Sequence, residues 1–332
     1  MQRKTRPTLQ DIADQVGITK MTVSRYLRDP GSVAQKTQQK IAAVIEELGY
    51  IQNRVPAILS KSSSRAIGII LPSLSNQVFA HLVQGIESVT KPAGYDTLIA
   101  HTGYSSKEEE EKIAALLSYR VDGLILTETN HTERTLQMLR SAAVPVVETM
   151  EIPACPIDMA VGLDHEQTSY EVVQEMLARG RKNIVYLGAR LDTRTRLRMQ
   201  GYERAMRDAG LEPQQISTGE HSSFTIGGVL LEKALAQCPQ LDAIFCTNDD
   251  VAIGAMMYCA HKGIEVPKQI AVVGYNALDI GQAIIPKLTS VETPRFAIGK
   301  KSAELLLAAL AGEEAEQKVY DLGYRLTIGD SL

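Results

Sequence analysis

Apolar residues in the first 50 positions recur at the three- and four-residue spacing of short amphipathic helices. Thr8 and Thr19 stand where they can cap the first two helices, and Gly17 supplies a turn between them. We therefore expect a compact helical unit at the N-terminus. The spacing predicts three helices, over residues 9–16, 20–27 and 34–48.

From residue 66 onward, short apolar runs alternate with longer amphipathic stretches. The apolar runs predict strands, at residues 66–71, 95–100, 123–127, 144–148, 184–188, 243–247 and 271–275. The amphipathic stretches predict helices, at residues 78–93, 106–119, 132–142, 166–179, 195–209, 226–237, 250–262 and 296–311. This alternation is typical of parallel sheets with helical crossovers, and its units are too many for one sheet. We predict an α/β fold: a helical N-terminal domain, then two doubly wound parallel sheets in two lobes with a ligand cleft between their strand ends.

The charge of the chain is unevenly distributed. The formal net charge is −4, yet residues 1–60 hold nine Lys and Arg against five Asp and Glu. A basic head on an acidic body indicates that only the head approaches a polyanion. The chain has no apolar run long enough to span a membrane, and no apolar stretch follows its basic N-terminus. We expect a cytoplasmic protein.

The sequence lacks the motifs of metal sites and of common catalytic sites. Its four cysteines form no Cys-x-x-Cys pair, so we interpret them as reduced thiols, and its six histidines show no metal-ligand spacing. There is no nucleophile elbow, zinc-protease motif or phosphate-binding loop. We expect no enzyme activity, no catalytic residues, no metal and no cofactor.

The segment LQDIADQVGITKMTVSRYL has the pattern of a helix-turn-helix. Ile12 and Ala13 suit the inner face of its first helix, Gly17 the turn, and Val23 with Tyr26 or Leu27 the inner face of its second helix. The second helix then presents polar residues at its start and can enter the major groove of DNA. The alternative is a small helical bundle whose polar face is merely solvated.

Several motifs in combination resemble the lactose-repressor family of bacterial regulators. They are LQDIA, GIT and TVSR in the head and LGYIQN after it. The resemblance continues through the body, where ILPSLSNQVFA, GIESVT, DGLILTE, IFCTNDD and DLGY are most similar to the gluconate- and idonate-utilisation repressors of that family. By this resemblance, the chain is identified as a member of the family.

The resemblance implies how the head contacts DNA. Lys20 and Met21 fall where the family reads bases, Lys20 toward guanine acceptors and Met21 toward a thymine methyl. Leu59 matches the leucine that wedges into the minor groove. Residues 51–65 are expected to fold on binding DNA, the alternative being a plain tether. The other expected DNA contacts are Thr8, Thr19, Thr22, Ser24, Arg25, Asn53 and Arg54.

The resemblance also implies the domain organisation. A helix-turn-helix domain covers residues 1–51, a hinge helix and linker cover 52–64, and the effector-binding and dimerisation domain covers 65–332. Lobe one of that domain takes about 65–162 and 293–322, and lobe two takes about 163–291 and 323–332. The chain ends directly after the last strand of the body, without the leucine-rich tail of some relatives, so we expect a homodimer.

The resemblance places a set of effector-binding residues at the cleft. Arg198 matches the family's effector-binding arginine and can clamp a carboxylate, the alternative being a solvated arginine at a helix start. Asn276 replaces an acidic residue of the family, which fits an anionic effector. Phe224 can stack on a sugar or pack in the core, and Asp249 can bind ligand or cap a helix. The remaining candidates are Asn76, Gln77, Glu128, Glu148, Arg194 and Asn248.

We therefore expect a transcriptional repressor whose operator affinity is controlled by a small sugar acid such as gluconate. The repressor would act in the cytoplasm, associated with the nucleoid, as a homodimer on a pseudo-palindromic operator and away from membranes. The alternatives are a neutral sugar or sugar phosphate as effector, a corepressor in place of an inducer, and, least favoured, a sugar-modifying enzyme.

Overall fold

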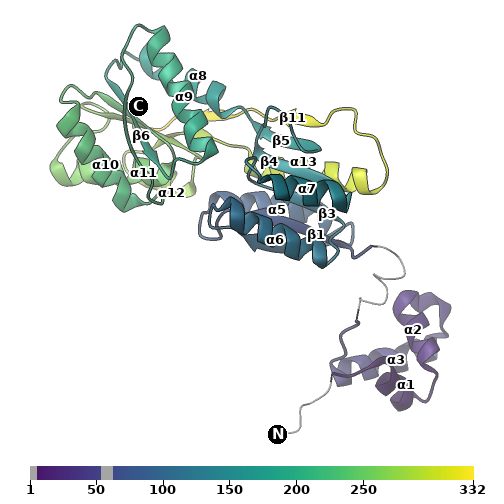
Figure 1. The fold of residues 1–332 in the computed structure, drawn as a ribbon. Coiled ribbons are helices and arrows are strands. Elements are labelled where there is room, and N and C mark those ends of the chain that lie inside the picture. The colour runs from purple at the N-terminus through teal and green to yellow at the C-terminus, as the bar shows by residue number, and fades with distance from the viewer. Residues whose placement is uncertain (1–5, 54–62) are drawn as a thin grey trace. The chain divides into compact units, whose positions relative to one another are not determined.

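The computed structural model describes residues 6–53 and 63–332. The chain forms two compact units that divide between Ser64 and Arg65 (Figure 1). The predicted residues Arg54 and Leu59 lie outside the described part of the chain.

The first unit, the head, is a small helical domain around one apolar cluster. Ile12, Ala13, Val23 and Ile41 are buried in that cluster, and Tyr26 and Leu27 pack against it. Gly17 follows the first helix with a φ of 74°, a left-handed conformation that turns the chain into the second helix. The helices are α1 (Leu9–Val16), α2 (Lys20–Arg28), the 3-10 helix η1 (Pro30–Ser32) and α3 (Gln35–Leu48).

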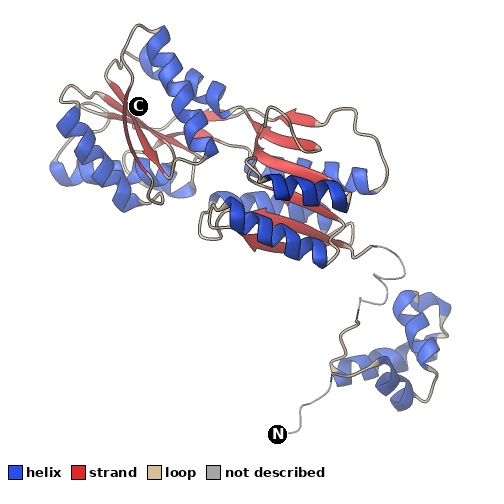
Figure 2. Cartoon of the chain, in the orientation of Figure 1, coloured by secondary structure: helices blue, strands red, loops and turns tan. Residues whose placement is uncertain are grey.

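The second unit, the body, holds two six-stranded sheets with helices on their faces (Figure 2). Lobe one is built on the sheet with strand order β11-β5-β4-β3-β1-β2, and lobe two on the sheet with order β12-β10-β9-β8-β6-β7. All strand pairs are parallel except the antiparallel pair of β10 with β12. The predicted α/β class with two doubly wound sheets is confirmed.

The elements of lobe one are β1 (Ala66–Leu71), α5 (Val78–Thr90), β2 (Asp96–His101), α6 (Ser106–Ser118), β3 (Gly123–Leu126), α7 (Glu133–Ala142), β4 (Val146–Glu151), β5 (Met159–Leu163), α13 (Arg295–Leu310) and β11 (Val319–Asp321). Those of lobe two are α8 (His165–Ala178), β6 (Ile184–Ala189), α9 (Thr193–Asp208), β7 (Gln214–Thr218), α10 (Phe224–Gln237), β8 (Ala243–Cys246), α11 (Asp249–Lys262), β9 (Ala271–Tyr275), α12 (Asp279–Ala283), β10 (Thr289–Glu292) and β12 (Arg325–Thr327). The chain therefore passes between the lobes three times, after β5, after β10 and after β11.

Three helix pairs in the body pack with their backbones in contact at glycines. A Cβ atom on Gly299 of α13 would lie 2.1 Å from the carbonyl oxygen of Leu82 in α5. A Cβ on Gly201 of α9 would lie 2.0 Å from Glu166 O in α8, and one on Gly254 of α11 would lie 1.9 Å from Phe224 O in α10. Any side chain at these positions would force the helices apart, so the glycines determine how closely each pair packs.

The structure corrects the sequence prediction at several strands. The predicted strand over 144–148 starts later and runs on to Glu151, because β4 pairs with β5 along that length. Five strands and one short helix were not predicted. They are β5, β7, β10, β11, β12 and α12.

Candidate functional site

The start of α2 presents an exposed apolar side chain between polar ones. Met21 is 67% exposed although it is large and apolar. Lys20 and Arg25 are exposed beside it, and no acidic residue lies in the first turn of α2. The helix start is therefore positive, from its dipole and its basic side chains, with one apolar group at its tip. This combination can approach phosphates and contact a base at the same time.

The other predicted DNA-contact residues of the head occupy helix starts or half-buried positions. Thr8 caps α1 and closes a capping box with Asp11. Thr19 caps α2 by accepting from the backbone N–H of Thr22. Thr22 and Ser24 are half-buried, and Asn53 is exposed at the end of the described head.

The strand ends of both lobes carry the predicted effector residues. Lobe one contributes Asn76 and Gln77 after β1 and Glu128 after β3. Lobe two contributes Asn248 after β8 and Asn276 after β9, and its helix α9 contributes Arg194 and Arg198. Because the sheets are parallel, these residues gather at one edge of each sheet.

Arg194 connects the two lobes. Its Nη1 donates to Thr127 O at 2.5 Å, and its Nη2 donates to Glu128 Oε1 at 2.5 Å. Asp192 lies nearby, and although burial opposes its ionised form, Arg194 and Arg190 hold the pKa of Asp192 well below its usual range. Burial raises the pKa values of Glu128 and Glu151. Although burial opposes the charged guanidinium, Glu128, Glu151 and Asp192 together raise the pKa of Arg194, so Arg194 is already paired with carboxylates of the protein.

Arg198 is buried but lacks such a partner. It is 6% exposed, and its Nη1 donates to Thr247 O at 2.5 Å. Its guanidinium carbon lies 3.7 Å from the centre of the Tyr275 ring. Within residues 6–53 and 63–332, Arg198 forms no ion pair, and its Nε has no hydrogen-bond partner. A buried cation without an ion-pair partner is costly, so the Arg198 guanidinium is able to bind an anion there.

The Tyr275 ring beneath Arg198 is held by a buried histidine. Burial lowers the pKa of His165 well below its usual value, so its imidazole is neutral. Its Nε2 lies 3.0 Å from Met150 O of lobe one, and its Nδ1 lies 2.8 Å from the Tyr275 hydroxyl. A neutral imidazole donates from one nitrogen only, so Nε2–H donates to Met150 O and Nδ1 accepts from Tyr275. These two hydrogen bonds orient the Tyr275 ring, which packs against the Arg198 guanidinium.

Asn248 and Asn276 border the same strand ends. Asn248 caps α11, and its Oδ1 accepts from the Ser222 hydroxyl at 2.8 Å. Asn276 is 5% exposed, and its side chain forms no hydrogen bond with any described residue. The Asn276 amide therefore keeps its donors and acceptor for a ligand. Phe224 opens α10 and is 41% exposed, so its ring is not a core residue.

Two of the candidate carboxylates are occupied by protein partners. Asp249 is fully buried, and its oxygens accept from Leu278 N at 2.5 Å and Ser290 Oγ at 2.6 Å. Glu148 lies within β4, not at its end, and accepts from Ile157 N at 2.6 Å. The cap of α11, the alternative role that the sequence allowed for Asp249, is supplied by Asn248.

Asn76 and Gln77 have different surroundings. Asn76 accepts from Val78 N at 3.1 Å and donates to the Tyr104 hydroxyl at 3.4 Å. Gln77 is exposed at the start of α5. Tyr104 itself faces lobe two, where Arg190 lies 4.2 Å from its ring centre.

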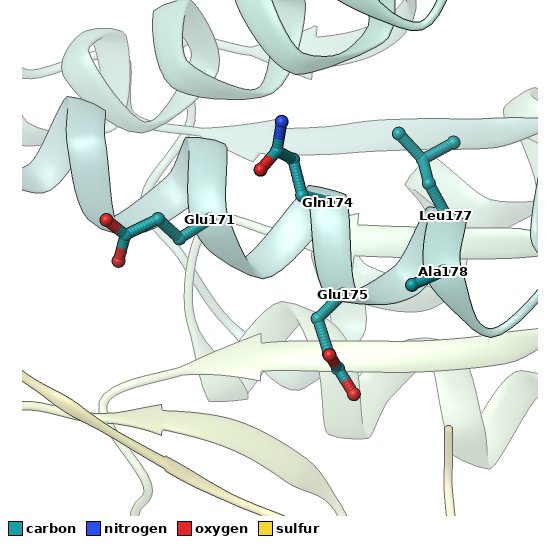
Figure 3. Close-up of a pocket in the computed structure, with 5 residues that line it drawn as sticks. All are labelled: Glu171, Gln174, Glu175, Leu177 and Ala178. Atoms are coloured by element: carbon teal, nitrogen blue, oxygen red, sulfur yellow. The ribbon is translucent and has the colours of Figure 1, made fainter.

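A cavity of about 460 Å³ lies beside this region, between the starts of α6 and α9. Tyr104 and Glu128 line it from lobe one, and Asp192 and Arg196 line it from lobe two. A separate hollow is formed by α8 alone, and Figure 3 shows that its five side chains project in different directions along that helix. Of the predicted effector residues, Glu128 alone lines the first cavity.

Sequence reasoning missed several residues of the site. Tyr104, Arg190 and Asp192 each follow a strand, which is the signal that could have found them. Tyr275 ends β9 and His165 follows β5, a strand that was not predicted, but their roles depend on a contact across 110 residues of sequence.

A buried histidine between two carboxylates lies next to the cavity. His131 Nδ1 is 2.8 Å from Glu109 Oε2, and its Nε2 is 3.5 Å from Glu148 Oε1. Burial opposes the charged imidazole, but Glu109 and Glu148 outweigh it and raise the pKa of His131 to about 9. His131 is therefore a cation that joins α6 to β4 at neutral pH.

We expect the contacts of His131 with Glu109 and Glu148 to stabilise the fold in a pH-dependent way. Its contribution is complete below the unfolded pKa of about 6.5 and disappears as pH rises through the folded pKa of about 9. His131→Gln should cost on the order of 3 kcal/mol more at about pH 6 than at about pH 10, measured by urea unfolding. The exposed His261→Gln variant should show no such difference. An equal cost of His131→Gln at both pH values would contradict a charged His131.

Among the described residues, no group of three His, Cys, Asp or Glu side chains is arranged to hold a metal ion. In the same part of the chain, no helix is long and apolar enough to cross a bilayer.

The fold and site define a class: a helix-turn-helix head followed by a two-lobed small-molecule-binding body. Residues 8–53 match the family described as bacterial regulatory proteins, lacI family. Residues 64–324 match the periplasmic binding proteins and sugar binding domain of the LacI family. The chain belongs to the LacI family of bacterial regulators.

Individual relatives agree over the whole chain. The chain is 50% identical to the HTH-type transcriptional regulator GntR of Escherichia coli K12, over 99% of this chain and 100% of that protein. It is 45% identical to the regulator IdnR of the same strain, over 99% and 100%. Among solved structures, a LacI-family regulator from Silicibacter pomeroyi superposes with a TM-score of 0.92 at 31% identity, over 98% and 99% of the two chains. The lac repressor dimer bound to operator and the anti-inducer ONPF superposes with a TM-score of 0.86 at 25% identity, over 98% and 99%.

The chain is thus a DNA-binding transcriptional repressor with an effector-binding domain, and not an enzyme. Like other members of its family it binds operator DNA and a small-molecule effector.

Proposed function

We propose that the effector of this repressor is a sugar acid of the gluconate type. The observation that carries the proposal is Arg198, a buried guanidinium with an unused Nε and no ion pair among the described residues. A ligand carboxylate at Arg198 supplies the missing counter-ion through charge-assisted hydrogen bonds. The similarity to the gluconate- and idonate-utilisation repressors supports the same chemical class.

The hydroxyl groups of such a ligand are assigned to the two asparagines. Asn276 offers a buried amide without a protein partner, and Asn248 lies at the neighbouring strand end. Phe224 provides an exposed ring on which the carbon chain can lie. Asn76 and Gln77 remain candidates at the lobe-one edge. Arg194 and Glu128 neutralise each other and border the ligand, while Glu148 and Asp249 act through protein contacts.

On the DNA side, we propose that Lys20 and Met21 read bases. Thr8, Thr19, Thr22, Ser24, Arg25, Asn53 and Arg54 contact the backbone of the duplex or flanking bases. Residues 52–64 form the hinge, and Leu59 is assigned as the minor-groove wedge. A homodimer binds a pseudo-palindromic operator, and the sugar acid acts as an inducer by favouring the DNA-free state, a coupling typically of about 1–3 kcal/mol. The exposure of the Met21 side chain supports its assignment as a base-reading residue.

A thermal-shift and operator-binding series tests the effector class. Gluconate should raise the Tm of the full chain and weaken operator binding. Glucitol, which has an alcohol where gluconate has the carboxylate, should do neither. Stabilisation by glucitol, neutral sugars or purines without stabilisation by sugar acids would refute the proposal. Stabilisation by gluconate together with tighter operator binding would keep the ligand class and make it a corepressor.

A further inference from the structure

The loop after β9 has an unusual backbone. Asn276 has a φ of 107° and Ala277 a φ of 47°, although neither is glycine. Left-handed conformations at two successive non-glycine residues cost free energy and persist only when the surroundings enforce them. The loop therefore needs strong contacts on several sides, and the next residue, Leu278, leads directly into α12.

Lobe two holds every backbone N–H of this loop. Asn276 N donates to Val291 O at 2.7 Å, and Ala277 N donates to Ser290 Oγ at 3.0 Å. Leu278 N donates to Asp249 Oδ2 at 2.5 Å, and the Ser290 hydroxyl donates to the other oxygen of Asp249. Asp249 fits because Gly274 leaves it room: a Cβ on Gly274 would lie 2.2 Å from Asp249 Oδ1.

Lobe one holds the same loop from the other side. Arg295 is the first residue of α13, a helix that packs on α5 in lobe one. Its Nη1 donates to Asn276 O and, at 3.2 Å, to Thr293 Oγ1. Arg295 is 7% exposed. In addition, the Leu278 side chain is 8% exposed and belongs to the apolar core cluster of lobe one, not to either cluster of lobe two.

We infer that Arg295 and Leu278 are positioning residues that hold the Asn276 loop against lobe one. Through these contacts, ligand binding at the loop in lobe two changes the position of lobe one. The inference rests on the proposed function in one respect, namely that Asn276 contacts the effector. A ligand shifts a conformational equilibrium only through contacts that differ between the two states. A loop whose N–H groups are bound in lobe two, and whose carbonyl and side chain are bound in lobe one, changes geometry whenever the lobes move.

The test compares Arg295→Met with Arg295→Lys and with Lys300→Met, an exposed change on the same helix. In the full chain without effector, Arg295→Met should raise hydrogen exchange at the amides of 276–278 at least about 10-fold. With gluconate as the probe, it should reduce the effector-dependent change in operator affinity at least about 5-fold and leave effector-free operator affinity unchanged. Arg295→Lys, which keeps a cationic donor, should recover part of both effects. Lys300→Met should behave like the wild type.

A second variant covers the case in which Arg295→Met does not fold. Leu278→Ala keeps all hydrogen bonds of the loop but removes its lobe-one packing, so gluconate should still bind while its effect on operator affinity falls. Full coupling in Leu278→Ala, or unchanged exchange and coupling in Arg295→Met, would overturn the inference. If gluconate does not affect the wild type, the proposed function fails, and the exchange measurement alone decides whether Arg295 holds the loop.

Discussion

Arg198→Met should abolish the response to sugar acids without harming the fold. The substitution removes a buried cation that forms no ion pair with any described residue, and methionine keeps most of the volume. Truncating one partner of a buried, hydrogen-bonded charge pair typically costs about 2–5 kcal/mol. We therefore expect the affinity for gluconate to fall roughly 30-fold to several-thousand-fold, measured by calorimetry.

The stability of Arg198→Met distinguishes a ligand role from a structural one. The variant loses the bond to Thr247 O and the stacking on Tyr275, but it also loses an uncompensated charge. We expect a Tm near that of the wild type in the absence of ligand, and unchanged operator affinity. Arg207→Met, an exposed change on the same helix, should retain the full response. A normal gluconate response in Arg198→Met would mean that the carboxylate binds elsewhere.

In the proposed homodimer, Met21→Ala should weaken specific operator binding by a large factor, because each of the two heads loses one proposed base contact. One base contact contributes about 1–3 kcal/mol, so two half-sites lose about 2–6 kcal/mol, or roughly 30-fold to 10⁴-fold in affinity. Met21 carries no charge, so non-specific binding and the salt dependence of binding should hardly change. Fluorescence anisotropy with an operator selected from a random duplex library measures both quantities.

Lys20→Ala is the charged counterpart of that experiment. It should lower specific affinity and also reduce the slope of log affinity against log salt, since fewer counter-ions are released. Lys40→Ala removes the same charge from an exposed position of α3 and should preserve the ratio of specific to non-specific affinity. Equal losses of specific and non-specific binding in Met21→Ala would exclude a base-reading role for Met21.

The helices could be predicted because each signal was local. Thr8, Thr19 and Gly17 are caps and turns that act within four residues, and the structure confirms them. The missed strands lack a local signal. β10 reads Thr-Ser-Val-Glu, and Thr289 and Ser290 can be buried because Ser290 binds Asp249 and Thr289 binds Ser331, far away in sequence. β7 exposes most of its residues at a sheet edge, and only Ile216 is buried.

The residues of the site also differ in whether a local sequence signal or a distant contact determines their role. Strand ends located Asn248 and Asn276, and the family resemblance located Arg198. Which carboxylates face a ligand was beyond sequence reasoning, because Glu128 is ion-paired with an arginine 66 residues away and Asp249 accepts a hydrogen bond from a backbone amide 29 residues away. Arg295 was missed because nothing near it in sequence marks its contact with Asn276.

The glycine contacts between helices have a mechanical consequence. Because the helix backbones are in contact at Gly299, Gly201 and Gly254, no layer of side chains separates the paired helices there. The two helices of a pair therefore have little room to shift relative to each other. We therefore expect each lobe to move as a rigid body, with the flexibility of the body in the three segments that connect the lobes. A change of the residues at the strand ends would then alter which ligand binds without altering how the two lobes move.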